Sequence, residues 1–102
     1  MTIAEAIRNE SLYPISESVI ELKLMKRDLQ GAAQATMDIL DSREYKGALA
    51  DTLATLIISP NVSEESGVSI SLPERNILLK YINSLYTAIG EKAVGVPRVE
   101  IL

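Results

Sequence analysis

The sequence predicts an all-α fold, a small bundle of four to five helices with an extended tail. Two stretches, residues 45–57 and 78–89, carry large aliphatic side chains three and four positions apart, the spacing that buries one face of a helix. Residues that favour helix starts and ends bracket both stretches. At 102 residues, 47% of them hydrophobic, the chain has the size of one domain with one core. We therefore expect residues 1–90 to form a helical domain and residues 91–102 an extended C-terminal tail.

A capping box predicts the first helix. Glu5 follows Thr2 by three residues, so each side chain can accept a hydrogen bond from the backbone N–H of the other residue. This pattern predicts a short helix over residues 3–9, and the segment from Ser11 to Pro14 predicts its end.

A second helix is expected after Ser16, a favourable N-cap residue. Its predicted buried face consists of the large apolar residues at helical spacing, which are Val19, Leu22, Met25 and Leu29. Gly31 is its predicted end, because glycine readily adopts the left-handed conformation that closes many helices. Residues 32–40 contain good helix formers but few large apolar side chains, and they predict a further short helix.

The strongest amphipathic segment predicts a helix from residue 42 to residue 58. Its predicted buried face is the row of residues Tyr45, Ala48, Leu49, Thr52, Leu53, Leu56 and Ile57. Asp41 and Glu44 have the spacing of a second capping box. Gly47 costs this helix about 1 kcal/mol relative to Ala. Either the helix begins later than predicted, or a neighbouring backbone needs the space at Gly47.

The last predicted helix begins with a third capping box, formed by Ser71 and Glu74. Pro73 lies in its first turn, where the missing N–H costs nothing. The predicted buried face is Leu78, Tyr81, Ile82, Leu85 and Ile89, and Gly90 is the predicted C-terminal cap. Between the two amphipathic helices, residues from about 60 to 72 are rich in Ser and Glu, and we expect a polar loop.

The composition argues against an enzyme. The chain has no His and no Cys, which excludes Ser-His-Asp and Cys-His arrangements, disulfides and thiolate metal sites. No glycine-rich phosphate loop and no calcium-loop spacing of acidic residues occurs. A carboxylate site built from Asp38, Asp41 and Asp51 is the one enzymatic arrangement left, and we disfavour it. We expect no catalytic residues, no cofactor and no metal.

The charge and the apolar runs restrict the partners and the compartment. A net charge of −4, with no Trp and no Phe, does not favour nucleic-acid binding. The one basic cluster, Lys23, Lys26 and Arg27, has acidic residues around it, and we interpret it as a solvated helix face. No stretch approaches the roughly 20 apolar residues of a membrane span, and the first ten residues do not resemble a signal peptide. We therefore expect a cytoplasmic protein without a membrane partner.

The apolar tail is the candidate interface. Its apolar residues are Val94, Val96, Val99, Ile101 and Leu102, at the end of the chain where most proteins are polar. Such a tail either folds back onto its own helices or lies along a neighbouring subunit as an added strand or arm. The loop over residues 60–72 is a second candidate, although a merely solvated loop is the favoured interpretation.

The order of these elements resembles the small head-tail connector (adaptor) proteins of tailed bacteriophages and prophages. The segment from Ser59 to Ser71, followed by the helix that contains Asn83-Ser84-Leu85-Tyr86, is similar to a family of uncharacterised bacterial proteins associated with prophage regions. The resemblance covers most of the chain. It implies an all-helical virion subunit that assembles into a ring between portal and tail and contacts its neighbours through loops and a terminal arm.

Two hypotheses of function follow. The first is a non-enzymatic phage or prophage structural or assembly protein that forms a homo-oligomer through its tail and one helical face. The alternative is a helical module that binds and regulates another protein, with a groove between the helix around Leu53 and the helix around Ile82.

Overall fold

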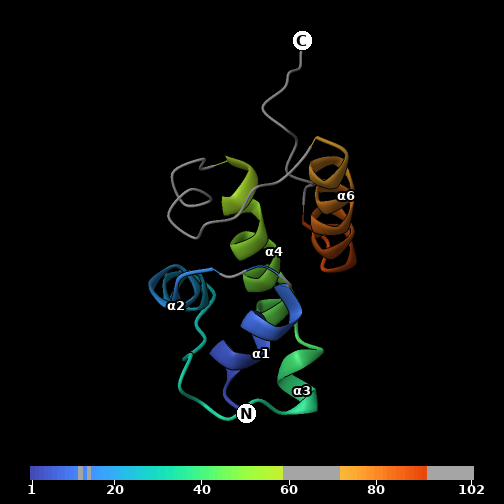
Figure 1. The fold of residues 1–102 in the computed structure, drawn as a ribbon. Helices are drawn as coiled ribbons and strands as arrows, with labels where there is room; N and C mark the ends of the chain where they lie inside the picture. The colour runs from blue at the N-terminus through green and yellow to red at the C-terminus, as the bar shows by residue number, and fades with distance from the viewer. Residues whose placement is uncertain (12, 14, 59–71, 92–102) are drawn as a thin grey trace.

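The computed structural model describes residues 1–11, 13, 15–58 and 72–91. Within these residues the protein has helices and no strand, so the predicted all-α fold is confirmed (Figure 1). The helices are α1 (Ile3–Ser11), α2 (Glu17–Lys26), α3 (Met37–Leu40), α4 (Arg43–Ile58) and α6 (Leu72–Ala88). The predicted tail, most of the predicted polar loop, and the proposed cap at Ser71 lie outside the described residues. None of the described helices is both long and apolar enough to cross a membrane.

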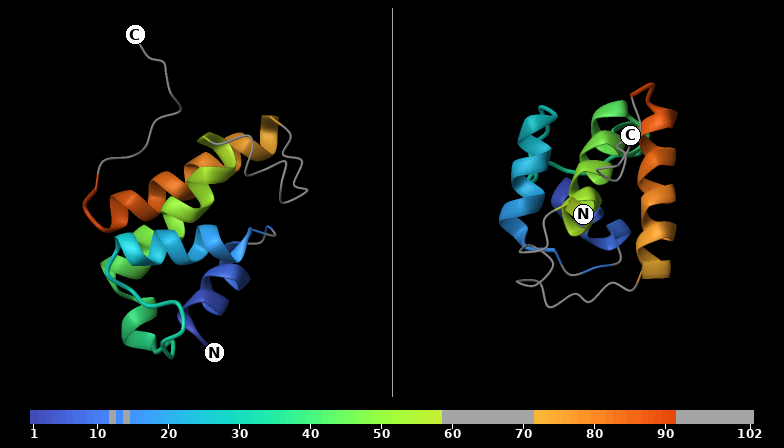
Figure 2. Two further views of the ribbon diagram at one scale, coloured as in Figure 1. Left: turned by 90° about the vertical axis from the view of Figure 1, so that its left-hand side faces the viewer. Right: turned by 90° about the horizontal axis from the view of Figure 1, so that it is seen from above.

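Helix α4 is the centre of the bundle. Helices α1, α2, α3 and α6 all pack against it, and α1 also packs against α2. Because neighbours surround α4, its buried residues extend beyond the predicted stripe to Ala50 and Ala54. Helices α2 and α6 lie on opposite sides of α4 (Figure 2), and among the described residues they make no direct packing contact.

The capping box at the start of α1 forms as predicted. The backbone N–H of Thr2 donates to the Glu5 carboxylate at 2.7 Å, and the N–H of Glu5 donates to the Thr2 hydroxyl at 3.2 Å. The helix continues two residues past the predicted end, to Ser11. The buried Ser11 hydroxyl donates to the carbonyls of Arg8 and Tyr13, so its polar group is satisfied in the core.

The predicted buried face of α2 is only partly correct, because Val19 and Leu29 pack against the core while Leu22 and Met25 are exposed. Ile20 and Leu24 are fully buried, whereas Leu22 is 48% exposed and Met25 is 70% exposed. The helix is apolar on two sides, and both sets of residues satisfy helical spacing. Only the position of α4 decides which side is buried, and hydrophobic periodicity does not contain that information.

Helix α2 also ends earlier than predicted, at Lys26. Asp28 adopts a left-handed conformation with φ of 61°. The N–H of Asp28 donates to the carbonyl of Met25, and the N–H of Leu29 donates to that of Leu24 at 2.9 Å. This is a Schellman motif with aspartate in the position that glycine usually takes, which aspartate tolerates better than most residues.

Gly31, the predicted end of α2, instead permits a close approach to α1. Its carbonyl accepts a hydrogen bond from the N–H of Ala4 at 3.0 Å. A Cβ at Gly31 would lie 3.2 Å from the Cβ of Ala4. The glycine was correctly singled out as special, but it serves packing between two segments and not helix termination.

Most of the helix predicted over residues 32–40 is absent. Only Met37–Leu40 is helical, with the Thr36 hydroxyl accepting from the N–H of Ile39 at its start. The preceding residues pair with the N-terminus instead, because the N–H of Ile3 donates to the carbonyl of Ala33 at 2.9 Å. A long-range backbone contact therefore overrides a weak local helix propensity.

The predicted helix over residues 42–58 is confirmed as α4, but its predicted cap is wrong by one residue. The Ser42 hydroxyl accepts from the N–H of Tyr45 at 3.2 Å. Asp41, the predicted capping residue, is the C-cap of α3 and has helical dihedral angles. Because α3 ends immediately before α4 begins, Asp41 belongs to the first helix and the next residue caps the second.

The predicted end of α6 is confirmed. Gly90 has φ of 79°, and its N–H donates to the carbonyl of Thr87. The N–H of Glu91 donates to the carbonyl of Tyr86 at 2.8 Å, which completes a second Schellman motif. The buried residues of α6 are Leu78, Ile82, Tyr86 and Ile89. Two members of the predicted stripe differ, since Leu85 is only half-buried and Tyr81 is 42% exposed.

Candidate functional site

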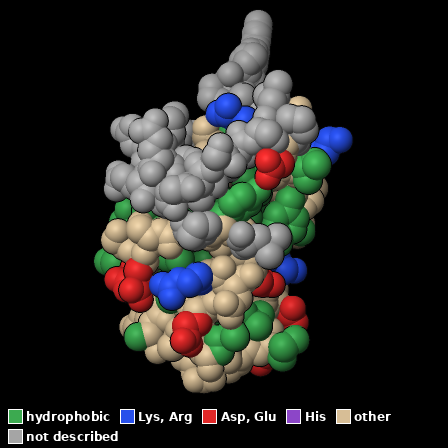
Figure 3. All heavy atoms as spheres, in the orientation of Figure 1, with side chains coloured by type: hydrophobic (Ala, Val, Ile, Leu, Met, Phe, Trp, Pro, Cys, Tyr) green, Lys and Arg blue, Asp and Glu red, His purple; other side chains and the backbone are tan. Residues whose placement is uncertain are grey.

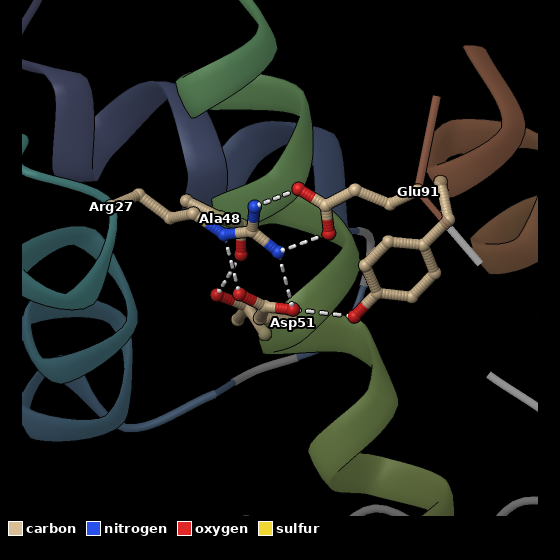
Figure 4. A network of polar contacts seen from close by, with 6 residues as sticks. Arg27, Ala48, Asp51 and Glu91 are labelled. Atoms are coloured by element: carbon tan, nitrogen blue, oxygen red, sulfur yellow. Dashed lines mark hydrogen bonds and ion pairs between the residues drawn. The ribbon is translucent and has the colours of Figure 1, made fainter. Parts of the chain in front are cut away.

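Arg27 joins three parts of the bundle on one side of α4 (Figure 4). Its guanidinium donates from Nε to Asp51 Oδ2 at 2.9 Å and from Nη2 to Asp51 Oδ1 at 3.2 Å. It also donates from Nη1 and Nη2 to the two carboxylate oxygens of Glu91, at 2.5 and 3.0 Å. These bonds raise the pKa of Arg27, with the Glu91 contact as the largest cause. The guanidinium therefore ties the end of α2 to α4 and to the first residue after the α6 cap. We call these three residues the Arg27 network.

Tyr86 extends the Arg27 network into the core. Its hydroxyl donates to Asp51 Oδ1. Burial raises the pKa of Tyr86, and the hydrogen bond to Asp51 raises it further. Burial therefore favours the protonated tyrosine, whose hydroxyl donates to the carboxylate oxygen.

Gly47 provides the space that the Arg27 network needs. A Cβ at this position would lie 2.5 Å from Cζ of Arg27. Helix α4 begins before Gly47, so the glycine does not mark a late helix start. The group that needs the room is an arginine side chain and not a neighbouring backbone. This finding corrects the expectation from the sequence.

A polar hollow of about 360 Å³ lies beside the Arg27 network. Its lining residues are Lys26, Arg27, Asp28, Arg43, Glu44 and Glu91. Among these described residues, three cationic side chains face three carboxylates, so their formal charges balance. The guanidinium of Arg27 is already bonded to two carboxylates. We therefore interpret the network as a structural clamp.

The predicted carboxylate site does not form. Asp51 belongs to the Arg27 network, while Asp38 and Asp41 are exposed at α3. Within the described ranges, no group of three or more acidic, His or Cys side chains is placed to hold a metal ion. The basic cluster expected from the sequence is also divided, because Arg27 points toward Asp51 and Glu91 (Figure 4), whereas Lys26 is exposed.

A second hollow, of about 300 Å³, lies on the other side of the bundle between the end of α1, α4 and α6. We call it the apolar hollow. Its lining residues are Glu10, Ser11, Tyr13, Leu53, Glu74, Ile77, Leu78 and Tyr81. The predicted groove near Leu53 therefore exists, but Ile82 is buried in the core and does not line it. Residues one turn earlier in α6 form that wall.

Hydrophobic side chains of α6 are exposed at the edge of the apolar hollow. Ile77 is 69% exposed and Tyr81 is 42% exposed. In the space-filling view, hydrophobic side chains gather over α6 with an acidic side chain among them (Figure 3). The Glu10 carboxylate accepts a hydrogen bond from the buried Tyr45 hydroxyl. Burial raises the pKa of Tyr81, and the negative charge of Glu10 raises it further. Among the described residues, the lining thus combines apolar surface with two acidic residues and no basic residue.

The tail residues predicted as an interface, Val94, Val96, Val99, Ile101 and Leu102, lie outside the described residues, and their role stays a prediction. Glu91, the first residue of the predicted tail, lies against Arg27 of the helical domain.

Sequence reasoning missed the exposed Ile77 and the contacts that join Arg27 to Asp51 and Glu91. Ile77 left a usable signal, because it is a large apolar residue outside the predicted buried stripe of its helix. The one signal of the Arg27 network in the sequence is Gly47, because glycine is unfavourable in the interior of a strongly patterned helix.

These features define a small all-helical domain with an ion-pair clamp on one side and an open apolar surface on the other. The chain belongs to a family of unknown function (DUF6706), which matches residues 1–101. No curated protein and no solved structure matches the chain.

Proposed function

We propose that this protein is a non-enzymatic structural or assembly protein of phage or prophage type, similar to a head-tail connector, that associates with copies of itself into a ring. The observation that carries the proposal is the apolar hollow with Ile77 and Tyr81 exposed at its edge. Contiguous apolar surface on a small domain is typical of a protein interaction site.

The composition of this surface supports an interface more than a small-molecule site. Tyrosine is one of the residue types that dominate the energetics of protein interfaces, and the buried core of an interface is more apolar than its rim. Ile77 projects from the helix and is mostly exposed, as expected for a residue that inserts into a partner. A catalytic site would require converging ionisable groups with unused hydrogen-bonding capacity. The converging groups of the Arg27 network are instead bonded to one another.

The apolar hollow also favours the alternative function, a helical module that binds another protein. An amphipathic helix docks into an apolar groove between helices through residues three and four positions apart. The walls from α4 and α6 provide such a groove. The two functions differ in the partner, because the first requires a second copy of this chain and the second requires a different protein.

The molar mass in solution tests the proposal. Light scattering on the purified chain, over a wide range of concentrations, is expected to give a multiple of 11.1 kDa. A full-length variant with Val94, Val96 and Val99 replaced by Ser measures the contribution of the tail, and weaker association is expected. A wild-type protein that stays at 11.1 kDa throughout would contradict self-association and leave the binding module as the better hypothesis.

A further inference from the structure

We infer that the ion pair between Arg27 and Glu91 is a latch that opens separately from the rest of the Arg27 network, so that the residue after the α6 cap is released while the bundle stays folded. The inference divides the structural clamp into two parts with different stability. It follows from three observations: Glu91 is held at two points, Asp51 is more enclosed than Glu91, and α6 has its own anchors in the core.

Glu91 is held through both its backbone and its side chain (Figure 4). Its N–H donates to the carbonyl of Tyr86 at 2.8 Å. Both oxygens of its carboxylate accept from the guanidinium of Arg27, at 2.5 and 3.0 Å. A carboxylate that is bonded through both oxygens is fixed in orientation as well as in position. The first residue after the α6 cap therefore has one place, beside the end of α2, for as long as the guanidinium holds it.

The two carboxylates that hold Arg27 differ in their exposure and in their bonds. The side chain of Glu91 is 38% exposed and that of Asp51 is 22% exposed. Asp51 lies within α4, accepts two hydrogen bonds from Arg27 and accepts a third from the Tyr86 hydroxyl. Water readily replaces the partner of an exposed ion pair, whereas it costs more to uncover an enclosed and fully bonded group. The bond to Glu91 is therefore the first part of the network to open.

Helix α6 does not depend on Glu91 for its place in the bundle. Ile82, Tyr86 and Ile89 are buried, and α6 packs against α4. Breaking the bond between Arg27 and Glu91 removes none of this apolar packing. Segments with few buried apolar contacts open locally, at free energies well below that of global unfolding. The latch can therefore open while the helix stays in place.

Release of Glu91 has a consequence for the predicted tail, which begins at this residue. In the proposed self-association, a tail that is held at its first residue has fewer conformations to lose when it binds a neighbouring copy. Opening of the latch is therefore expected to weaken the association. This consequence rests on the proposed function, whereas the latch itself does not.

Hydrogen exchange of the backbone amides tests the latch in the full-length chain. Glu91→Ala removes it, and Glu44→Ala is the matched control, because Glu44 is an exposed glutamate that lines the same polar hollow without belonging to the Arg27 network. Protection factors correct for the change of side chain. In Glu91→Ala, protection at Gly90 and at residue 91 is expected to fall about tenfold, while protection at Ile82 and Tyr86 changes by less than about threefold. The control is expected to behave like wild type.

Three results would overturn the latch. An unprotected Glu91 amide in the wild-type chain would show that the turn is already open. Unchanged protection at residue 91 in Glu91→Ala would show that Arg27 does not hold this residue. An equal loss of protection at residue 91, Ile82 and Tyr86 would show that the network opens only together with the whole helix.

Light scattering on the same two variants separates the latch from the proposed function. Glu91→Ala is expected to associate about threefold or more weakly than wild type, and Glu44→Ala like wild type. A local loss of protection with unchanged association would support the latch and overturn its role in the tail. If wild type itself stays monomeric, the proposed function and the role in the tail both fail, and hydrogen exchange still decides the latch.

Discussion

A hydrogen bond from a tyrosine hydroxyl to a carboxylate occurs on each of the two sides of α4, but its surroundings differ. On one side the Tyr86 hydroxyl donates to the Asp51 carboxylate, and on the other the Tyr45 hydroxyl donates to the Glu10 carboxylate. Both tyrosines are buried, and burial is the main cause that raises the pKa of each. The sides differ in the cation. Arg27 completes the first pair, whereas no basic residue in the described part of the chain lines the hollow beside the second.

We infer from this difference that the Arg27 network stabilises the fold, whereas the side chains at the apolar hollow are available for binding. Where a guanidinium matches the carboxylates, the charges are compensated and the helix ends are held together. Helices α2 and α6 make no direct packing contact among the described residues, so the bond between Arg27 and Glu91 links their ends. On the other side, the side chains of Ile77 and Tyr81 stay exposed at the edge of the apolar hollow.

The largest effect on stability is expected from Arg27→Ala. The substitution leaves two carboxylates and a tyrosine without their cation, and we expect a loss of about 2–3 kcal/mol in the free energy of unfolding. Urea denaturation measures this loss. Lys80→Ala, which removes an exposed cation from α6, is the control and is expected to change stability by less than about 0.5 kcal/mol. Equal effects of the two substitutions would show that the Arg27 network does not clamp the bundle.

The effect of Gly47→Ala on the free energy of unfolding is expected to change sign when Arg27 is also replaced. In the wild-type chain the new Cβ displaces the guanidinium, and this loss outweighs the gain of about 1 kcal/mol in helix propensity. We expect a net destabilisation of about 1 kcal/mol. In an Arg27→Ala background the displaced group is gone, and the same substitution is expected to stabilise by about 1 kcal/mol. A destabilising effect in both backgrounds would show that another neighbour requires the glycine.

The sequence predicted those parts of the fold whose signals are local. The reciprocal bonds of Thr2 and Glu5, the extent of α4, and the cap at Gly90 depend on residues within one or two turns of each other. The buried side of α2 was not predictable in this way, because the helix offers two apolar stripes and α4 selects one of them. The end of α2 was missed because aspartate at residue 28 takes the left-handed position that glycine usually marks.

The candidate site was less predictable than the fold, because its residues are distant in the sequence. Arg27 lies 24 positions from Asp51 and 64 positions from Glu91. No helical or capping pattern connects residues at such separations. The groove beside Leu53 was expected, but its exposed wall was not. Tyr81 fits the helical spacing as well as the buried residues of α6 do, and only the packing of α6 against α4 decides which of them are buried.

Removing each tyrosine hydroxyl sharpens the comparison of the two sides. Tyr86→Phe is expected to lower the free energy of unfolding by about 1 kcal/mol, because Asp51 loses a partner in a largely closed network. Tyr45→Phe is expected to cost about 0.5 kcal/mol, because the Glu10 carboxylate is exposed and water replaces the hydroxyl. Thermal unfolding of the two variants in parallel measures the difference. A larger cost for Tyr45→Phe would reverse our assignment of the closed and open sides.

The smallest expected effect is the pH dependence that Glu91 contributes. Its hydrogen bonds with Arg27 lower its pKa below the ordinary value of 4.5. The stabilisation is therefore fully present above that value and is lost as the pH falls through the lowered pKa of the folded protein. We expect wild type to be more stable than Glu91→Gln at neutral pH. The difference should shrink as the pH is lowered below the ordinary pKa of 4.5.

Because Glu91 lies near solvent, screening keeps this difference small, and melting temperatures at closely spaced pH values are needed to resolve it. The control is the same substitution in an Arg27→Ala chain, where the pKa of Glu91 has lost its main cause of depression. There the two curves should run parallel. A pH-dependent difference that persists without Arg27 would mean that another group holds Glu91, and the clamp between α2 and the end of α6 would have to be assigned to different residues.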